Sequence, residues 1–246
     1  ETVDKNSPEI VLLNPSTLRD GYFAEIGFSG SGETGKLPGP DTVWTVEGNQ
    51  TLTPSTPVTL TYTNDKGLTF KRTISVDGEY MFTIDDTVTN AGGAPVSIAN
   101  YGRVTRFEKP DDRSTCVLHE GLIGFTGTEG LQEIKYATIE EEKQVTPGKS
   151  DDGWLGITDK YWAVALVPSE KQPFQPRFGF YDDGRTRYQS DYLTDPINLA
   201  PGQSTTLETM VFAGAKEVST INAYEKDRHI RQFDLLIDWG WFYFIT

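Results

Sequence analysis

The chain has 246 residues, of which 36% are hydrophobic and 12% aromatic, and its formal net charge is −14 at pH 7. This composition argues against disorder and supplies enough apolar material for one large all-β domain or two ordinary domains. Because phosphate recognition needs clustered Lys and Arg, the acidic balance argues against nucleic-acid binding, and it also disfavours electrostatic docking to anionic lipid.

The sequence contains neither a complete membrane span nor a signal peptide. Its longest apolar run, residues 239–245, is far shorter than the roughly 20 residues that cross a bilayer. Residue 1 begins a polar stretch that lacks the basic and apolar regions of a signal peptide. We expect both ends to be the boundaries of a piece of a longer protein. Cys116 is the only cysteine, so an internal disulfide is excluded.

The first half of the chain predicts β-strands separated by turns. Residues 22–28 form the first predicted strand, and a loop rich in glycine and proline follows at residues 29–40. β-Branched and aromatic residues predict further strands, which are residues 42–46, 58–63, 68–76, 80–89 and 96–107. We expect the strands on either side of Asp77-Gly78 to form a hairpin around a two-residue type I′ turn.

The second half continues this pattern and then changes. The charged residues 139–143 predict a solvated edge or turn, whereas the continuous apolar run 161–167 predicts a central strand covered on both faces. Shorter strands are predicted at residues 188–192 and 205–212. From Ala215 onward, apolar residues recur every three positions, with Arg and His near residue 230, and this pattern predicts a helix. We expect about a dozen or more mainly antiparallel strands followed by one short helix.

Aromatic residues crowd the last eight positions of the sequence. Exposed apolar surface of this size must be buried, and Trp and Tyr favour the boundary between lipid headgroups and acyl chains. One interpretation is a C-terminal element packed into the domain core, and the other is a linker that enters a membrane. On the second interpretation, the membrane-proximal residues are Asp238, Trp239, Gly240, Trp241, Phe242 and Phe244.

Residues that could carry catalysis are few. Cys116 and His119 lie three positions apart, but on the strand expected here they would point to opposite faces, so we do not predict a catalytic pair. His229 is expected to be solvated. The adjacent acids, among them Asp85-Asp86 and Asp182-Asp183, are interpreted as solvated loop residues and not as a glycosidase pair. The spacing of Cys, His and acidic residues predicts no metal site, and the glycines match no nucleotide-binding loop, so no cofactor is expected.

Three tryptophans remain as candidate groove residues. If Trp44, Trp154 or Trp162 is exposed in a groove, its ring can stack on a sugar, whereas a buried ring belongs to the core. In such a strand-rich context the core interpretation is favoured.

Two stretches resemble a known family. Residues 152–168 resemble a pattern of glycine and Trp, Lys-Tyr, strand and Pro in the large periplasmic domain of the YidC family of bacterial membrane protein insertases. Residues 233–242 are similar to the segment that joins this domain to the family's second transmembrane helix. The hairpin at residues 70–88 and the turn and strand at 199–212 follow in the same order. The resemblance covers most of the chain.

The resemblance implies a fold and a role. The fold would be an all-β supersandwich similar to galactose mutarotase over residues 1–214, with a short C-terminal helix and an aromatic linker over residues 215–246. The role would be that of a non-enzymatic periplasmic domain at the inner membrane, in a protein that inserts and helps fold membrane proteins. Implied partners are nascent membrane proteins, SecYEG and SecDF, with membrane attachment through transmembrane helices outside this chain.

The resemblance has two gaps, and two other interpretations stay open. Strands that precede the stretch matching residues 9–13 in the family are not found here. His119 and His229 do not stand at recognisable equivalents of the mutarotase histidines, so fold similarity does not imply that activity. A carbohydrate-binding or mutarotase-like sandwich is the main alternative. A secreted structural module is the other, and it predicts no membrane helix after Thr246.

Overall fold

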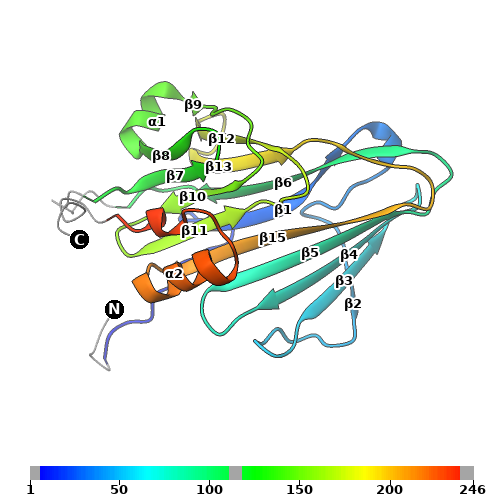
Figure 1. The fold of residues 1–246 in the computed structure, drawn as a ribbon, viewed down its shortest axis with the longest axis horizontal. Coiled ribbons are helices and arrows are strands. Elements are labelled where there is room, and N and C mark those ends of the chain that lie inside the picture. Colours follow the sequence, from blue (N-terminus) through cyan, green and yellow to red (C-terminus); the bar gives the residue numbers. More distant parts are fainter. Residues whose placement is uncertain (1–5, 111–117, 239–246) are drawn as a thin grey trace.

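The computed structural model describes residues 6–110 and 118–238, and it folds into two facing β-sheets (Figure 1). Every strand pair in these residues is antiparallel. The smaller sheet has the order β1 (Tyr22–Gly30), β6 (Val96–Arg106), β13 (Arg187–Thr194), β12 (Phe174–Tyr181) and β9 (Gln144–Val145), with β14 (Ile197–Leu199) against β6. The prediction of an all-β fold with mainly antiparallel strands is confirmed.

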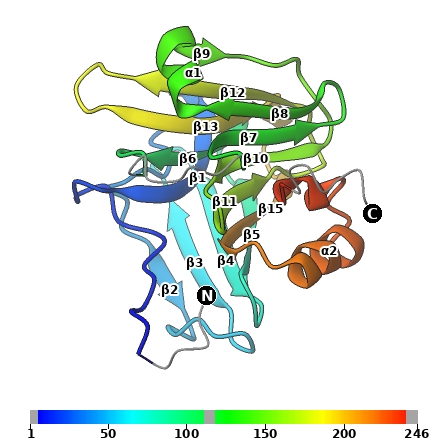
Figure 2. The ribbon, with the colours of Figure 1, turned by 90° about the vertical axis from the view of Figure 1, so that its left-hand side faces the viewer.

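The larger sheet has nine strands and curves around the smaller one (Figure 2). Its order is β2 (Thr45–Glu47), β3 (Val58–Thr63), β4 (Leu68–Val76), β5 (Met81–Asn90), β15 (Ser204–Ala215), β11 (Trp162–Val167), β10 (Gly153–Thr158), β7 (Gly121–Thr126) and β8 (Gly130–Lys135). The helical elements are η1 (Gly32–Thr34), α1 (Tyr136–Glu142), α2 (Val218–Asp227) and η2 (Phe233–Leu236), of which η1 and η2 are 3₁₀ helices.

Apolar residues cover both faces of the large sheet around β11. Val164 and Leu166 point toward the small sheet and join the cluster between the sheets. Ala163 and Ala165 alternate with them and join a second cluster on the opposite face, where α2 and η2 pack. Alternation along a strand places successive side chains on opposite faces, so a strand buried on both sides must be apolar throughout. The predicted central strand at residues 161–167 is therefore confirmed.

The hairpin of β4 and β5 forms as predicted, but its turn does not. Val76 pairs with Phe82, which leaves a loop longer than two residues between the strands. The Asp77 backbone N–H donates to the Met81 carbonyl at 3.1 Å, and its Oδ1 accepts backbone N–H groups of Glu79 and Met81. Because the Asp77 carboxylate supplies these acceptors, the loop closes without a type I′ turn.

Two predictions about helices need correction. Residues 139–143 were expected to be a solvated edge or turn, but α1 covers most of them because Tyr136 and Ile139 are both buried against the core. The expected onset of the last helix at Ala215 is also wrong, since β15 extends to that residue and α2 begins at Val218. The helix ends at Asp227, before the basic residues that were expected to complement its dipole. The division of the chain after residue 214 stays a prediction.

Candidate functional site

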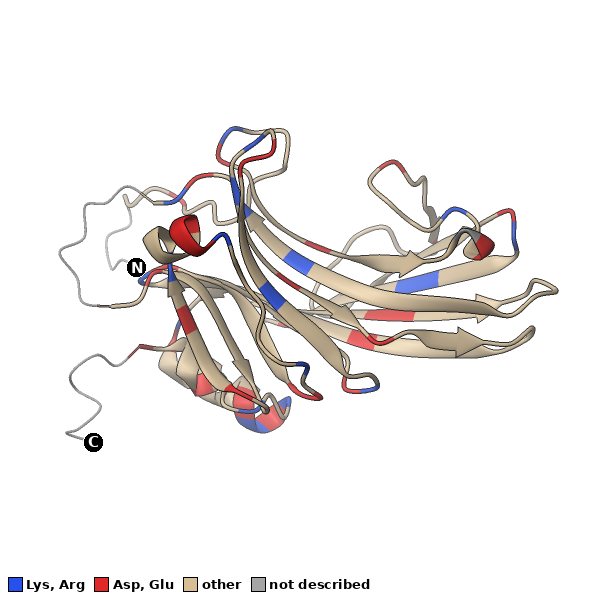
Figure 3. Cartoon of the chain, turned by 90° about the horizontal axis from the view of Figure 1, so that it is seen from above, with Lys and Arg blue, Asp and Glu red and all other residues tan. Residues whose placement is uncertain are grey.

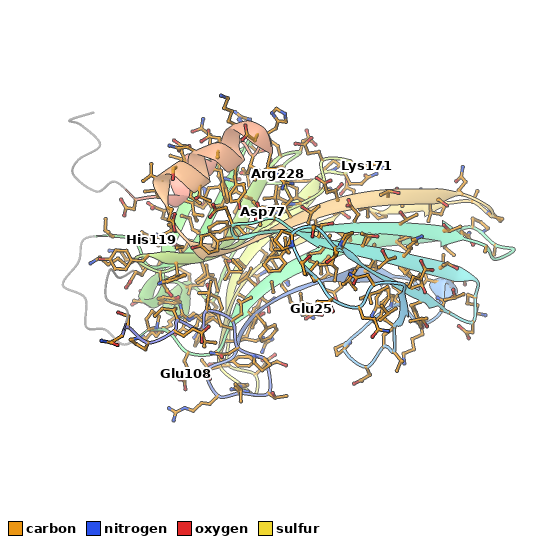
Figure 4. The ribbon with its side chains drawn as sticks, turned by 90° about the horizontal axis from the view of Figure 1, so that it is seen from below. Glu25, Asp77, Glu108, His119, Lys171 and Arg228 are labelled. Atoms are coloured by element: carbon orange, nitrogen blue, oxygen red, sulfur yellow. The ribbon has the colours of Figure 1, made fainter. Side chains whose placement is uncertain are left out.

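Helix α2 fixes the C-terminal part of the chain to the large sheet. Its buried residues are Ile221 and Tyr224, one helical turn apart. The Tyr224 hydroxyl donates to Asp77 Oδ2 at 2.6 Å and accepts the Tyr80 backbone N–H at 3.1 Å, which joins the helix to the β4–β5 loop. Burial raises the pKa of the Tyr224 hydroxyl, so it stays a donor at neutral pH. Figure 4 shows Asp77 and Arg228 close together at this end of the helix.

A second contact follows at η2. The Phe233 side chain is fully buried, and its ring lies edge-on against Trp154 at 5.6 Å and against Phe212 at 5.7 Å between ring centroids. The Trp154 Nε1–H donates to the Arg231 carbonyl at 3.2 Å. Gln232 adopts a left-handed conformation with φ 56° at the start of η2, so the chain turns sharply into these contacts. We call α2 and η2 together the C-terminal platform.

Asp238, the last described residue, is also held. Its Oδ2 accepts the His119 backbone N–H at 2.8 Å, just before β7 begins. The His119 ring contacts the Leu122 carbonyl through Nε2 at 2.9 Å and is buried, so it is a structural residue. The platform and Asp238 therefore hold the last described residues against the large sheet and the start of β7. The other predicted membrane-proximal residues, Trp239, Gly240, Trp241, Phe242 and Phe244, lie outside the described residues.

Lys216 lies close to Asp238. Its Nζ donates to Thr158 Oγ1 at 2.9 Å. Burial lowers the pKa of Lys216 to about 8, although four nearby carboxylates oppose the shift. These carboxylates belong to Asp159, Asp238, Glu120 and Glu133. Lys216, Asp159, Asp238 and Glu120 are half-buried and Glu133 is exposed, so a cluster of charges that the sequence alone did not reveal lies beside Asp238.

The three candidate tryptophans have different environments. Trp154 is completely buried under η2 and cannot stack on a sugar, so it belongs to the core. Trp162, at the start of β11, is partly buried and does not line the cavity beside Trp44. Trp44 is partly buried beside the Arg72 guanidinium, which lies 5.5 Å from the ring centroid, and it lines a cavity of about 370 Å³. Trp44 therefore fits the groove interpretation, because it lines a cavity.

The adjacent acids differ in exposure. Asp85 and Asp86 point to opposite faces of β5, and Asp86 is buried and pairs with Arg72, so the prediction of solvated acids is wrong there. Asp182 and Asp183 are exposed, as predicted. His229 is exposed, as expected. Cys116 lies outside the described residues. Within residues 6–110 and 118–238, no group of three or more His, Cys, Asp or Glu is arranged to hold a metal ion.

A row of alternating charges crosses the outer face of the small sheet. Glu25, Arg103, Asp191 and Arg177 stand directly opposite one another on β1, β6, β13 and β12. Arg103 binds the Glu25 carboxylate through two nitrogens at 2.8 and 2.9 Å, and Arg177 binds that of Asp191 at 3.1 Å. Figure 3, seen from above, shows acidic and basic residues on neighbouring strands. The row depends on strand register, which the sequence alone did not reveal.

Among the described residues, no helix is long and apolar enough to cross a membrane. A family model described as the YidC periplasmic domain matches residues 1–246. The chain belongs to the YidC periplasmic domain family. The resemblance based on residues 152–168 and 233–242 is therefore confirmed.

Curated relatives agree with the family, and a solved structure agrees with the fold. The membrane protein insertase YidC of Mesorhizobium japonicum is 74% identical over 246 residues, which are the whole chain and 41% of that protein. The YidC insertase of Brucella melitensis is 62% identical over 247 residues and is covered to 40%. The chain thus spans about two fifths of the length of these curated relatives. A galactose mutarotase-like protein from Lactobacillus casei has the same fold, with a TM-score of 0.50 and 11% identity over 77% of this chain and 84% of that protein.

Proposed function

We propose that this chain is the periplasmic part of an inner-membrane protein insertase, and that it supports insertion without an enzymatic activity of its own. The observation that carries the proposal is the match of the YidC periplasmic domain family to residues 1–246. The relatives that cover the whole chain are named membrane protein insertases, which supports the same role.

The C-terminal platform suggests how the domain contributes. The platform packs on the large sheet through Phe233, and Asp238 is held at the start of β7. A chain that leaves a rigid platform has a defined direction, so the aromatic residues after Asp238 would meet the membrane at a fixed angle to the domain. In this proposal, Trp239 and Trp241 lie at the lipid interface, where Trp side chains are favoured.

The proposed partners follow from the family. Nascent membrane proteins would be the substrates of the whole protein, and SecYEG and SecDF would be its partners at the periplasmic face of the inner membrane. The formal net charge of −14 supports attachment by hydrophobic segments over electrostatic docking, since anionic headgroups repel an acidic surface. Nucleic acid and cofactors have no part in the proposal.

A sugar-binding sandwich is the competing function, because Trp44 lies beside a cavity of about 370 Å³. The likeness to a galactose mutarotase-like protein supports the fold alone, at 11% identity. Calorimetric titration of the chain with galactose and other common sugars separates the two functions. Saturable binding at millimolar or lower concentration that disappears in Trp44→Ala would favour the sugar function, and its absence would favour the insertase domain.

The experiment that tests the proposed function most cheaply is to sequence the source gene beyond the codon for Thr246. The proposal expects several apolar segments of about 20 residues, separated by loops rich in Lys and Arg. A stop codon or a second polar domain directly after Thr246 would contradict it.

A further inference from the structure

The turn between β10 and β11 carries the one exposed aromatic side chain of the described residues. Tyr161 is 50% exposed, whereas every other Phe, Tyr and Trp in residues 6–110 and 118–238 is buried or partly buried. A single exposed apolar side chain is common on a protein surface, so only the surroundings of Tyr161 can indicate a role for it.

The backbone of this turn is held by several contacts. The Asp159 N–H donates to the Trp162 carbonyl at 2.8 Å, and the Tyr161 carbonyl accepts the Lys216 N–H at 2.8 Å. The Asp159 carboxylate also pairs with Arg106 at 2.6 Å, and both of these side chains are less than one-fifth exposed. The exposure of Tyr161 is therefore a fixed feature of the surface and does not come from a loose loop.

The turn lies beside the last described residue. The Lys160 backbone N–H donates to Glu120 Oε1 at 3.2 Å, and the N–H of the adjacent His119 donates to Asp238 Oδ2 at 2.8 Å. In the sequence, Asp238 is followed directly by the aromatic run that was predicted to enter a membrane. The turn and the start of that run therefore lie at the same end of the domain.

Helix α2 begins beside the same turn and adds apolar surface to it. Val218, the first residue of α2, is 41% exposed and follows two positions after Lys216, whose N–H bonds to Tyr161. The helix packs beside β11 and β15 (Figure 2). Trp162 follows Tyr161 directly and is partly exposed. We call Tyr161, Trp162 and Val218 together the turn patch.

The charges of the turn suit a lipid surface better than those of the whole chain. The Lys160 Nζ lies 4.9 Å from the centroid of the Tyr161 ring, which is a cation–π contact. The carboxylate of the turn, on Asp159, is neutralised by Arg106, so the turn presents no net negative charge although the chain carries −14. Tyr and Lys together are typical of the membrane interface, because the ring is amphipathic and the ammonium reaches the headgroups.

We propose that the turn patch contacts a phospholipid bilayer, with the Tyr161 ring at the boundary between headgroups and acyl chains. Lipid is the occupant that the position favours, because the chain continues from Asp238 into residues of the same interfacial chemistry. A contact beside the linker would restrict the tilt of the domain, which a linker alone leaves variable. This inference rests on the proposed function and deepens it, since it adds a membrane contact within the described domain.

The test places a fluorescent label beside the turn in the full-length protein. Val218→Cys, in a background without other cysteines, is labelled with bimane and reconstituted into vesicles of phosphatidylethanolamine and phosphatidylglycerol. The vesicles also contain phosphatidylcholine with a nitroxide on its headgroup, which quenches bimane at short range. We expect at least twofold more quenching at position 218 than for the control Val43→Cys, which is 88% exposed beside the edge strand β2. Equal quenching at the two positions would overturn the proposal.

Variants of Tyr161 test the ring itself. Tyr161→Ser removes the ring, and Tyr161→Trp replaces it with another side chain that favours the interface. Both variants should fold, because the side chain is half exposed. We expect Tyr161→Ser to reduce the quenching at position 218 by at least half and Tyr161→Trp to retain it. The same quenching in Tyr161→Ser as in the parent would contradict the role of Tyr161.

A third label separates this inference from the proposed function. Phe242→Cys reports on the predicted membrane-proximal linker. Quenching at position 242 but not at 218 would overturn the turn contact and leave the proposed function intact, whereas no quenching at either position would contradict both. Protection of position 218 from iodide without quenching by the nitroxide lipid would assign the turn patch to a protein partner and overturn the lipid proposal.

Discussion

Arg72 joins the core of the large sheet to strand β1. Its guanidinium binds Asp86, whose side chain is 4% exposed, and also donates to the Ile26 carbonyl. Removing one partner of a buried ion pair leaves an uncompensated charge, which typically costs about 3–5 kcal/mol. We therefore predict that Arg72→Met lowers the free energy of unfolding in urea by that amount.

The neighbouring residue supplies the control for this prediction. Lys71 pairs with Glu47 at 3.5 Å, and both side chains are at least half exposed. Exposed pairs contribute about 0–1 kcal/mol, so Lys71→Met should change the free energy of unfolding by less than 1 kcal/mol. Similar losses of stability in the two variants would show that the Asp86 carboxylate does not need Arg72 to compensate its charge.

The lowered pKa of Lys216 predicts how the stability of the chain changes with pH. Its pKa is about 8 in the folded chain against an ordinary value of 10.5. Between these values the unfolded chain binds more protons than the folded chain, so stability rises with pH. Relative to Lys216→Met, the free energy of unfolding of the parent chain should increase by roughly 1–3 kcal/mol between pH 7.5 and 10.5. Urea unfolding of both proteins across this range measures the difference, and parallel curves would refute it.

At the scale of single residues, the sequence predicted the direction of a side chain on its strand better than the burial of that side chain. The alternation of Asp85 and Asp86 was predictable, yet the burial of Asp86 depends on Arg72 from the neighbouring strand. Trp154 and Trp44 looked alike in sequence, and only the packing of η2 over Trp154 separates them. Such differences arise from strands that meet in space, which a single sequence does not specify.

Element η2 is short but central to the C-terminal platform. Phe233 is enclosed by Trp154 and Phe212 from two strands of the large sheet. Truncating a buried Phe costs about 3–5 kcal/mol, since the cavity left behind is filled only in part. We predict this loss for Phe233→Ala in urea unfolding, together with faster amide hydrogen exchange in α2.

A helix surface residue provides the comparison for that prediction. Val218 begins α2 and is 41% exposed. Val218→Ala should alter the free energy of unfolding by no more than about 0.5 kcal/mol. If Phe233→Ala were as mild as this substitution, η2 would not anchor the C-terminal platform.

At the scale of elements, strands were easier to predict than helices. The β4–β5 hairpin and β11 followed from alternation and from continuous apolarity. Helix α1 was missed because three consecutive Glu residues hid the spacing of Tyr136 and Ile139. The prediction of a type I′ turn at Asp77-Gly78 was wrong because the Asp77 carboxylate accepts backbone hydrogen bonds and closes a longer loop.

For the whole molecule, the strand pattern and two motifs predicted the fold and the family, but not its surfaces. The cavity beside Trp44 lies where β1 ends the small sheet and the large sheet extends further through β4, β3 and β2. The row from Glu25 to Arg177 likewise requires four strands in one register. Neither feature leaves a signal in a single sequence, since each depends on long-range pairing.

The most direct test of the central claim is an insertion assay with the full-length protein. If the C-terminal platform sets the direction of the chain toward the membrane, Phe233→Ala and the double variant Trp239→Ala/Trp241→Ala should each reduce insertion of a single-span reporter protein at least threefold. Glu141→Ala/Glu142→Ala on α1 is the control, because both side chains are exposed, whereas Glu140 bonds to Tyr188 and Lys109. The claim predicts wild-type insertion by this control at equal protein levels. Equal insertion by all three variants would contradict it.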